Sequence, residues 1–563
     1  MHEERGPAPA ESPEARPQDP ANGEFANSEF AGLARRLAAR LPRPDGAVTK
    51  AAAGAAFAAF FARSASASST GSSTTPVPTS FDPLLVRLVN RVCGGFQLEQ
   101  YHAAVNAGSH QAYLDQQLAY TPSGDAALQA TLQQWPVLDQ LNGITSSPPA
   151  DIPTLAALNH QPLNWARFLQ SQTMVRRICT AGPLFERMVE LWSDHLNISA
   201  FDKAIGLLKA VEDRDAIRAH ALGDFGAMLH ANALSAAMLI YLDNWTNSKP
   251  TYQENYAREL LELHTLGVNN GYTENDIKAV AACFAGHTFD FGTLGASYNG
   301  SFHDDAPSYL LLTSSGTSIP VPSGGIGQAT TVLDGLIVHP NTKEYVAGKL
   351  TRWLVGYEPS STALGDVLGA WGTTGDIQAM TNAALSPQTI ADVEQSGVLK
   401  LKRPSELAVN LLRALGATLS GPTMGDPVLA LVDELTELGN APHAWSPPNG
   451  YPDSEGAWSA GVLGRWRLVR KLMFNELTGI TIDSADLLAP LLPLWPGQVS
   501  EMPRQISRVL TGDTLTTSEM TVVQIFFDQL TPVALTPGSG YTPDDLVRDT
   551  YALVASAPSY QYH

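Results

Sequence analysis

Histidines crowd into the middle of this 563-residue chain. Six of its 13 histidines fall between residues 195 and 303, namely His195, His220, His230, His264, His287 and His303. Neutral imidazole is the commonest metal ligand among side chains and the usual proton shuttle near neutral pH. We therefore expect any chemically active site to lie in or near this part of the chain.

Carboxylates accompany these histidines in the stretch 253–273, QENYARELLELHTLGVNNGYT. On a helix of 3.6 residues per turn, Glu259 and Glu262 share one face with Asn255, whereas His264 lies on the apolar face. Two carboxylates one turn apart that face a cleft can bind a metal or act as a general acid and base. In this interpretation Glu259 and Glu262 are catalytic, and Asn255 orients the ligand.

The same polar face also has a structural interpretation. Glu254, Arg258 and Glu262 follow one another at four-residue steps, which allows two ion pairs worth roughly a few tenths of a kcal/mol each. The face would then meet solvent, and His264 would be a core histidine. The residues alone leave both interpretations open.

Three further histidines are candidates for the same site. His303 precedes Asp304 on an expected loop, where polar residues often serve function, so we expect a catalytic role for His303 and a binding role for Asp304. His195 lies at the edge of an apolar helical stripe and is either a core residue or a metal ligand. His195, Glu259 and His303 form the expected ligand set of a divalent metal. His220 is either a binding residue or part of an ion-pair lattice in the run DRDAIRAH.

The elements that position these residues are predicted to be mainly α-helical. From about residue 81, apolar residues recur at three- and four-residue steps, which indicates a large multi-helix domain over residues 80–563. Thr273 and Asp276 have the spacing of a helix-capping box. His339 stands directly before a proline and is expected to cap the helix that follows.

Two segments break the helical pattern. Residues 288–323 are rich in Gly, Ser, Tyr and Thr with short alternating runs, which predicts a small β-hairpin insertion. Residues 442–453, PHAWSPPNGYPD, form a Pro/Gly loop that is expected to be rigid. Its aromatic residues Trp445 and Tyr451 either pack within the loop or line a ligand cleft.

Residues 1–79 have the composition of a low-complexity, disordered N-terminus rather than a packed domain. Within them, residues 35–67 contain an arginine pair, a short Ala/Phe-rich run and an A-x-A pattern, the three parts of an export signal. The pair resembles a twin-arginine signal. The alternative is an alanine-rich tail on a cytoplasmic protein. No apolar run reaches the roughly 20 residues that a membrane-spanning helix needs.

Composition excludes several classes of function. Lys and Arg number 35 against 55 Asp and Glu, so the formal net charge is −20, which argues against nucleic acid and anionic membrane surfaces as partners. The three cysteines have neither disulfide-framework nor zinc-ribbon spacing. The motifs HExxH, GxSxG, GxxxxGK[ST] and GxGxxG are absent, so zincin, α/β-hydrolase, P-loop and Rossmann functions have no local support.

A set of longer motifs resembles the bacterial family of unknown function numbered eighteen hundred. The motifs occur in family order and include RLVNRVCGGF (87–96), MVELWSDHLNI (188–198), QENYARELLELHTLGVNNGYTENDI (253–277), LIVHPNT (336–342), KRPSEL (402–407) and NGYPDSEGAW (449–458). The resemblance implies a helical, frequently exported protein, often encoded beside a sulfatase-like partner. FAGH at 284–287 replaces the more usual FTGW, and Ala306 to Ser308 replace Gly-Pro-Lys, as in a divergent member.

Two functional hypotheses follow. The first is an exported metal- or carboxylate-dependent hydrolase that uses Glu259, Glu262, His195 and His303. The second is a non-enzymatic cell-envelope binding or scaffold protein in which the same residues form a structural polar network. A stoichiometric divalent metal and loss of phenotype in a Glu259→Gln variant would distinguish the first from the second.

Overall fold

A computed structural model describes residues 31–32, 76–135, 138, 162–203, 205–306, 308–310, 312, 318–396, 399–421, 427–494, 497–536 and 538–563. The export signal expected within residues 35–67 lies outside the described residues and stays a prediction. Within the described part, no helix combines the length and the apolarity that crossing a bilayer requires.

Helices make up most of the described chain, as the periodicity predicted. The first half contains α3 (Pro83–Cys93), α4 (Leu98–Ala107), α5 (His110–Leu118), η1 (Pro122–Gly124), α6 (Ala126–Leu132), α9 (Pro162–Cys179), α10 (Pro183–His195), α11 (Gly206–Glu212), η2 (Asp213–Arg218), α12 (Phe225–Ala233), α13 (Ala236–Tyr241), η3 (Asn244–Thr246), α14 (Asn255–Glu259), η4 (Leu260–Thr265) and α15 (Glu274–Phe284). The segments η2 and η4 are π-helical continuations of α11 and α14.

The second half continues the helical architecture. It contains α16 (Gly327–Ile337), α17 (Pro340–Leu354), α18 (Ser361–Gly369), α19 (Ile377–Ala384), α20 (Pro387–Ser396), α21 (Pro404–Ala414), α22 (Leu429–Glu437), α23 (Glu455–Trp458), η5 (Ser459–Gly461), α24 (Val462–Met473), α25 (Ser484–Leu488), η6 (Ala489–Leu494), η7 (Val499–Glu501), α26 (Met502–Thr511), α27 (Thr517–Ala534), α28 (Pro543–Ala555) and α29 (Pro558–Gln561).

The predicted β insertion is present as two short antiparallel pairs. Strand β1 (His287–Asp290) pairs with β2 (Gly295–Tyr298), and β3 (Ser308–Leu310) pairs with β4 (Ile319–Val321). A third pair joins β5 (Thr418–Leu419) to β6 (Ile480–Thr481). This pair has no local sequence signal, because its two-residue strands are far apart in the chain.

Local hydrogen bonds at helix starts confirm the capping predictions. The Thr273 hydroxyl accepts from the Asp276 amide at 3.3 Å, and the Asp276 carboxylate accepts from the Thr273 amide at 2.8 Å. At the start of α17, Nδ1 of His339 accepts from the Asn341 amide at 3.2 Å. Both helices therefore begin where the sequence predicted, because the cap satisfies amides that lack a partner in the first turn.

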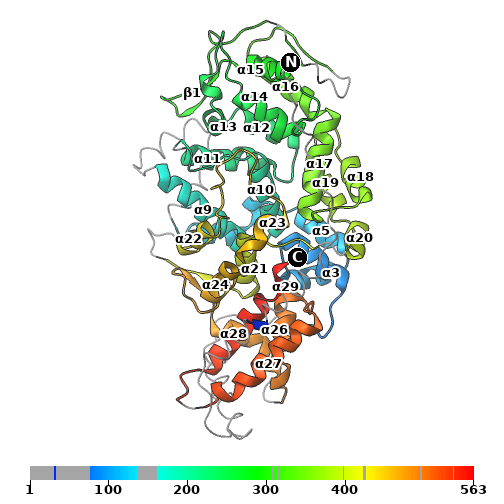
Figure 1. The fold of residues 1–563 in the computed structure, drawn as a ribbon, viewed down its shortest axis with the longest axis vertical. Helices are drawn as coiled ribbons and strands as arrows, with labels where there is room; N and C mark the ends of the chain where they lie inside the picture. The colour runs from blue at the N-terminus through cyan, green and yellow to red at the C-terminus, as the bar shows by residue number, and fades with distance from the viewer. Residues whose placement is uncertain are drawn as a thin grey trace, which may run out of the picture.

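The helices are arranged along one long axis (Figure 1). Helices α12 to α16 and strand β1 form one end, and α26, α27 and α28 form the other. Between them, α10 and α21 lie near the centre, with α17 to α19 along one side. Almost every residue of α10 and of α21 is buried, so polar groups on these two helices must find partners inside the protein.

Candidate functional site

A cavity with a volume of about 430 Å³ lies between the end of α10 and one face of α17. This size is within the range typical of small-molecule sites, roughly 300–1,000 Å³. Its remaining walls are the start of α21 and the loop 449–453. The lining residues are Leu191, Asp194, His195, Glu344, Tyr345, Gly348, Lys349, Arg352, Trp353, Arg403, Asn449, Gly450, Tyr451, Pro452 and Asp453. We call this cavity the α10–α17 cleft.

Helix α17 presents one continuous face to the cleft. Glu344, Gly348 and Arg352 follow at four-residue steps, and Tyr345 and Lys349 form the neighbouring row, so all five lie on one side of the helix. At Gly348 a Cβ atom would meet no heavy atom within 4 Å. The backbone of α17 is therefore open to the cleft at its middle, between Glu344 and Arg352.

His195 ends α10 and is held by the end of another helix. The chain turns at Gly267, whose φ is +98°, and the carbonyls of the preceding turn have no further helical amides to bond. One of them, the His264 carbonyl, lies 3.1 Å from Nε2 of His195. Because a carbonyl only accepts, Nε2 carries the hydrogen, and Nδ1 of the neutral ring is left as an acceptor.

Lys349 donates to this acceptor. Its Nζ lies 3.2 Å from Nδ1 of His195 and 4.8 Å from the centre of the Tyr345 ring. Burial lowers the pKa of Lys349 to about 8, although Asp194 and Asp453 act in the opposite direction. Burial, together with the charge of Lys349, also lowers the pKa of His195 well below its usual value. Near neutral pH the pair is thus an ammonium donating to a neutral imidazole.

The remaining charges of the cleft divide into paired and unpaired groups. Asp194 lies 2.5 Å from Arg403, and Asp453 lies 2.7 Å from the buried Lys400. Within the described part of the chain, no carboxylate oxygen comes within 4.0 Å of the side-chain nitrogens of Lys349 or Arg352. Two of the three lining acids, Asp194 and Asp453, are therefore paired with cations. Glu344 and the two α17 cations, Lys349 and Arg352, have no ion-pair partner among the described residues.

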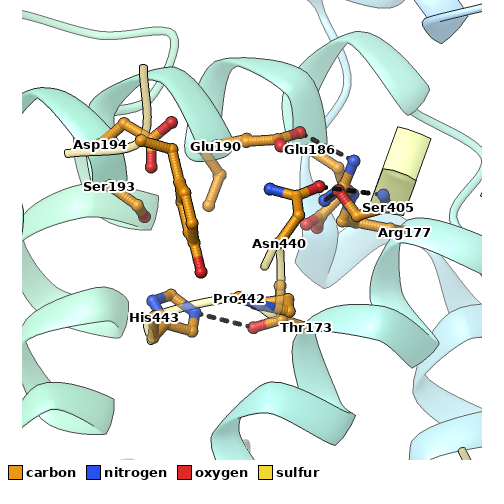
Figure 2. A pocket seen from close by; sticks show the side chains of 12 residues that line it. Thr173, Arg177, Glu186, Glu190, Ser193, Asp194, Ser405, Asn440, Pro442 and His443 are labelled. Atoms are coloured by element: carbon orange, nitrogen blue, oxygen red, sulfur yellow. Dashed lines mark hydrogen bonds and ion pairs between the residues drawn. The ribbon is translucent and has the colours of Figure 1, made fainter. Parts of the chain in front are cut away.

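A second, smaller cavity of about 30 Å³ is shown in Figure 2. Asp194 and Tyr451 line both cavities. Figure 2 shows Thr173 and His443 joined by a hydrogen bond of 3.0 Å on one wall of the small cavity. A space of this size holds about one water molecule, so it is too small for a substrate.

The loop that carries Tyr451 is fixed against α10 by its glycine. Gly450 has a φ of +70°, and a Cβ at this position would lie 2.1 Å from the Asp194 carbonyl oxygen. The Tyr451 hydroxyl donates to the Ala441 carbonyl at 2.7 Å. Tyr451 is thus both packed in a rigid loop and part of a cleft wall, which unites the two alternatives that the sequence left open.

Of the residues predicted to have catalytic, binding or metal-ligand roles, His195 is the one that lines the α10–α17 cleft. Glu262 lies 3.8 Å from Arg258, and Glu254 lies 3.7 Å from it, which are the two i,i+4 pairs of the structural interpretation. Arg258 binds Glu274 more closely, with two nitrogen–oxygen distances of 2.9 Å. Glu259 is half-buried on the same helix, and burial beside Glu262 raises its pKa.

The other predicted residues have separate surroundings. Nδ1 of the buried His303 donates to the Ala285 carbonyl at 2.8 Å, and Asp304 is exposed and accepts from the Tyr252 hydroxyl at 3.3 Å. His220 is half-buried, and burial lowers its pKa. Asn255 starts α14, and its amide donates to the Gln253 side chain at 3.2 Å. None of the four lines the cleft.

The divalent-metal ligand set His195, Glu259 and His303 stays a prediction. Among the residues that the structure describes, no three His, Cys, Asp or Glu side chains are grouped so that they could hold a metal ion. His195 and His303 each contact a backbone carbonyl of a different segment, that of His264 and that of Ala285. Catalytic and binding roles for Glu259, Glu262, Asn255 and the other candidates stay predictions.

Lys349, Arg352, Gly348 and Tyr345 belong to the cleft but were missed by sequence reasoning. Their helix was predicted, yet its charges looked like those of any amphipathic helix. A signal was present in Gly348, because a glycine in the middle of a helix costs about 1 kcal/mol relative to alanine and needs a reason. Gly348 lies beside the open cleft.

Comparison with known families places the chain. The model of a family described as a protein of unknown function, DUF1800, matches residues 87–562. The chain therefore belongs to this family, which confirms the resemblance of its motifs. No curated protein and no solved structure matches it. The family description names no activity.

Proposed function

We propose that this protein is an exported hydrolase whose substrate binds in the α10–α17 cleft, with Lys349 as the proton-transfer residue. The observation that carries the proposal is the hydrogen bond of 3.2 Å between Nζ of Lys349 and Nδ1 of His195 at the wall of the cleft. His195 is a positioning residue, because its own proton is held by the His264 carbonyl.

The chemistry of such a pair fits hydrolysis. Hydrolysis needs a group that removes a proton from water and a group that protonates the departing atom, and such groups work best when their pKa lies near the working pH. Burial lowers the pKa of Lys349 to about 8, so its ammonium and amine forms are both populated in mildly alkaline solution. Glu344 is the lining carboxylate that has no cation within 4.0 Å among the described residues, and it is the candidate for the second group.

Hydrolysis of chromogenic esters tests this proposal. Purified protein is assayed with 4-nitrophenyl acetate, phosphate, sulfate and glycosides between about pH 6 and pH 10. We expect turnover of one class, a rate that rises through about pH 8, and loss of turnover in Lys349→Met. Lys343→Met removes the same charge from α17 outside the cleft and should keep the activity. Equal rates in both variants, or no turnover of any class, would contradict the proposal.

A non-enzymatic binding or scaffold protein is the second candidate. The observation that favours it is the number of buried ion pairs away from the cleft. Arg187 binds Glu406 at 2.6 Å. Arg218 binds Asp213 at 2.6 Å and Glu186 at 2.8 Å, and all of these side chains are deeply buried. Such networks place many charged residues inside the protein without catalysis. Ligand binding in the cleft that persists in Lys349→Met, with no turnover, would support this candidate.

Export and a partner are part of the first proposal. The arginine pair and the apolar run within residues 35–67 support export, and the family resemblance supports a sulfatase-like partner. Cell fractionation of the full chain and of an Arg35→Lys, Arg36→Lys double variant tests the first point. Co-purification with the neighbouring gene product tests the second. Retention of the full chain in the cytoplasm would argue against export.

A further inference from the structure

We infer that the α10–α17 cleft takes a small molecule with a single oxyanionic group, which binds Arg352 and Lys349 across the open backbone of Gly348. This inference rests on the proposed function, because it names the substrate class of the same site. The shared chemistry is a phosphate, sulfate or carboxylate oxygen that accepts hydrogen bonds from a guanidinium and an ammonium.

The charge distribution of the cleft supports an anion. Asp194 and Asp453 are held by cations at 2.5 Å and 2.7 Å. Among the described residues the unpaired lining charges are then two cations, Arg352 and Lys349, against one acid, Glu344. An unpaired cation in a partly desolvated cavity is unfavourable unless a counter-charge enters. This cost is larger for Lys349 than for Arg352, because Lys349 is more deeply buried. The Lys349 ammonium contacts an imidazole and an aromatic ring instead of an acid.

The geometry of α17 places both cations around one opening. Arg352 follows Gly348 by one helical turn on the same row, and Lys349 is its immediate neighbour on the next row. Because a Cβ at Gly348 would meet nothing within 4 Å, a ligand atom can approach the helix backbone at this point. A guanidinium and an ammonium then converge on the ligand from two sides, which suits an oxyanion with more than one accepting oxygen.

Size and net charge limit the ligand to a small molecule. A volume of about 430 Å³ encloses a ligand of drug-like size rather than a polymer. The chain carries a formal net charge of −20, which disfavours long polyanions such as nucleic acid whatever the local charge of the cleft. Two aromatic residues, Tyr345 of α17 and Tyr451 of the loop 449–453, line the cleft and suit a flat or apolar group attached to the oxyanion.

Titration calorimetry with phenyl phosphate, benzoate, phenyl sulfate and the neutral control phenol tests the inference. We expect at least one of the three anions to bind the wild-type protein, and phenol not to bind. Arg352→Gln removes a side chain that is exposed and has no acidic partner, so the fold is retained. We expect it to weaken binding at least about tenfold, which corresponds to about 1.4 kcal/mol. Lys343→Gln, with the same change of charge on α17, should bind like the wild type.

A second variant tests whether the ligand approaches the α17 backbone closely, apart from the effect of charge. Gly348→Ala adds a methyl group that points into the cleft, raises helix propensity and should therefore raise the melting temperature while it weakens anion binding. Failure of all three anions to bind, or equal affinity of the wild type and Arg352→Gln, would overturn the inference. The three ligands also identify the anion, since tighter binding of phenyl phosphate, phenyl sulfate or benzoate points to that class of substrate.

The two proposals can fail separately. Anion binding that depends on Arg352, without hydrolysis of any ester, would leave the inference standing and overturn the hydrolase. Hydrolysis that depends on Lys349, acts on a neutral ester and is unchanged in Arg352→Gln would support the hydrolase and overturn the inference.

Discussion

The pKa of Lys349 links the cleft to the stability of the whole protein. In the unfolded chain this lysine should titrate near its ordinary value of 10.5, whereas burial lowers the folded-state pKa to about 8. That difference corresponds to about 3 kcal/mol of unfavourable interaction with the charged form. Between these pH values the unfolded state binds more protons than the folded state, so the free energy of unfolding rises with pH.

Lys349→Met keeps the length of the side chain but removes the titration. We expect the wild type to gain about 3 kcal/mol relative to this variant as pH rises from about 8 to 10.5. The measurement is urea denaturation of both proteins at closely spaced pH values. The buried residues Lys400 and Lys402, whose pKa values burial lowers to about 8 and about 7, are present in both proteins, so their contributions cancel.

A constant or falling difference over this interval would refute the reasoning, because the folded state would then carry no penalty for the Lys349 ammonium. Lys343→Met is the matched control on α17. A second readout avoids unfolding altogether: acylation of Lys349 by acetic anhydride, followed by peptide mass spectrometry, should become fast above about pH 8. Only the amine form reacts, so the midpoint reports the pKa directly.

Three further variants test the packing around the cleft by urea denaturation. Gly450→Ala would place a Cβ 2.1 Å from the Asp194 carbonyl oxygen, so we expect a loss of about 3 kcal/mol or more and a displaced loop. Glu406→Gln leaves the buried Arg187, now 2.6 Å away, without its anion and should cost about 3–5 kcal/mol. Thr273→Ala removes a helix cap and should cost about 1 kcal/mol. If the free energy of unfolding falls by less than about 0.5 kcal/mol in one of these variants, the contact described for that residue does not stabilise the protein as argued.

The fold was largely predictable because its main signals are local. Apolar spacing indicated the helices, and the caps at Thr273 and His339 are hydrogen bonds within two or three residues. The π-helical turns at Asp213–Arg218 and Leu260–Thr265 were not foreseen, since residue types do not distinguish them from α-helix. The β5–β6 pair was missed for another reason, which is that its strands meet only through tertiary packing.

The cleft was less predictable, because its properties depend on which charges lack partners. Arg352 and Arg403 are alike in sequence, yet Arg403 is buried against Asp194 at 2.5 Å and Arg352 is exposed without an acid. Histidine crowding drew attention to His195, which lines the cleft, but its partner Lys349 is 154 residues away in the chain. No periodicity or spacing within one helix reports a contact of this kind.

The stretch 253–273 acts on the cleft through its backbone rather than through its carboxylates. Its acidic face is engaged by Arg258, whereas its last turn ends at Gly267 and leaves the His264 carbonyl to bind His195. That one bond selects the His195 tautomer whose free nitrogen accepts from Lys349. The same end supports the cleft wall, since a Cβ at Gly267 would lie 3.1 Å from the Tyr345 ring.

It follows that a change at Gly267 should disturb the cleft more than a change at Glu259. Gly267→Ala forces a Cβ into a backbone conformation with φ of +98° and against Tyr345, so we expect it to displace α17 and to lower anion affinity. Glu259→Gln alters a side chain outside the cleft lining and should leave that affinity unchanged. If the same calorimetry shows a larger loss of affinity in Glu259→Gln than in Gly267→Ala, the acidic face of this stretch takes part in ligand binding and the reasoning is wrong.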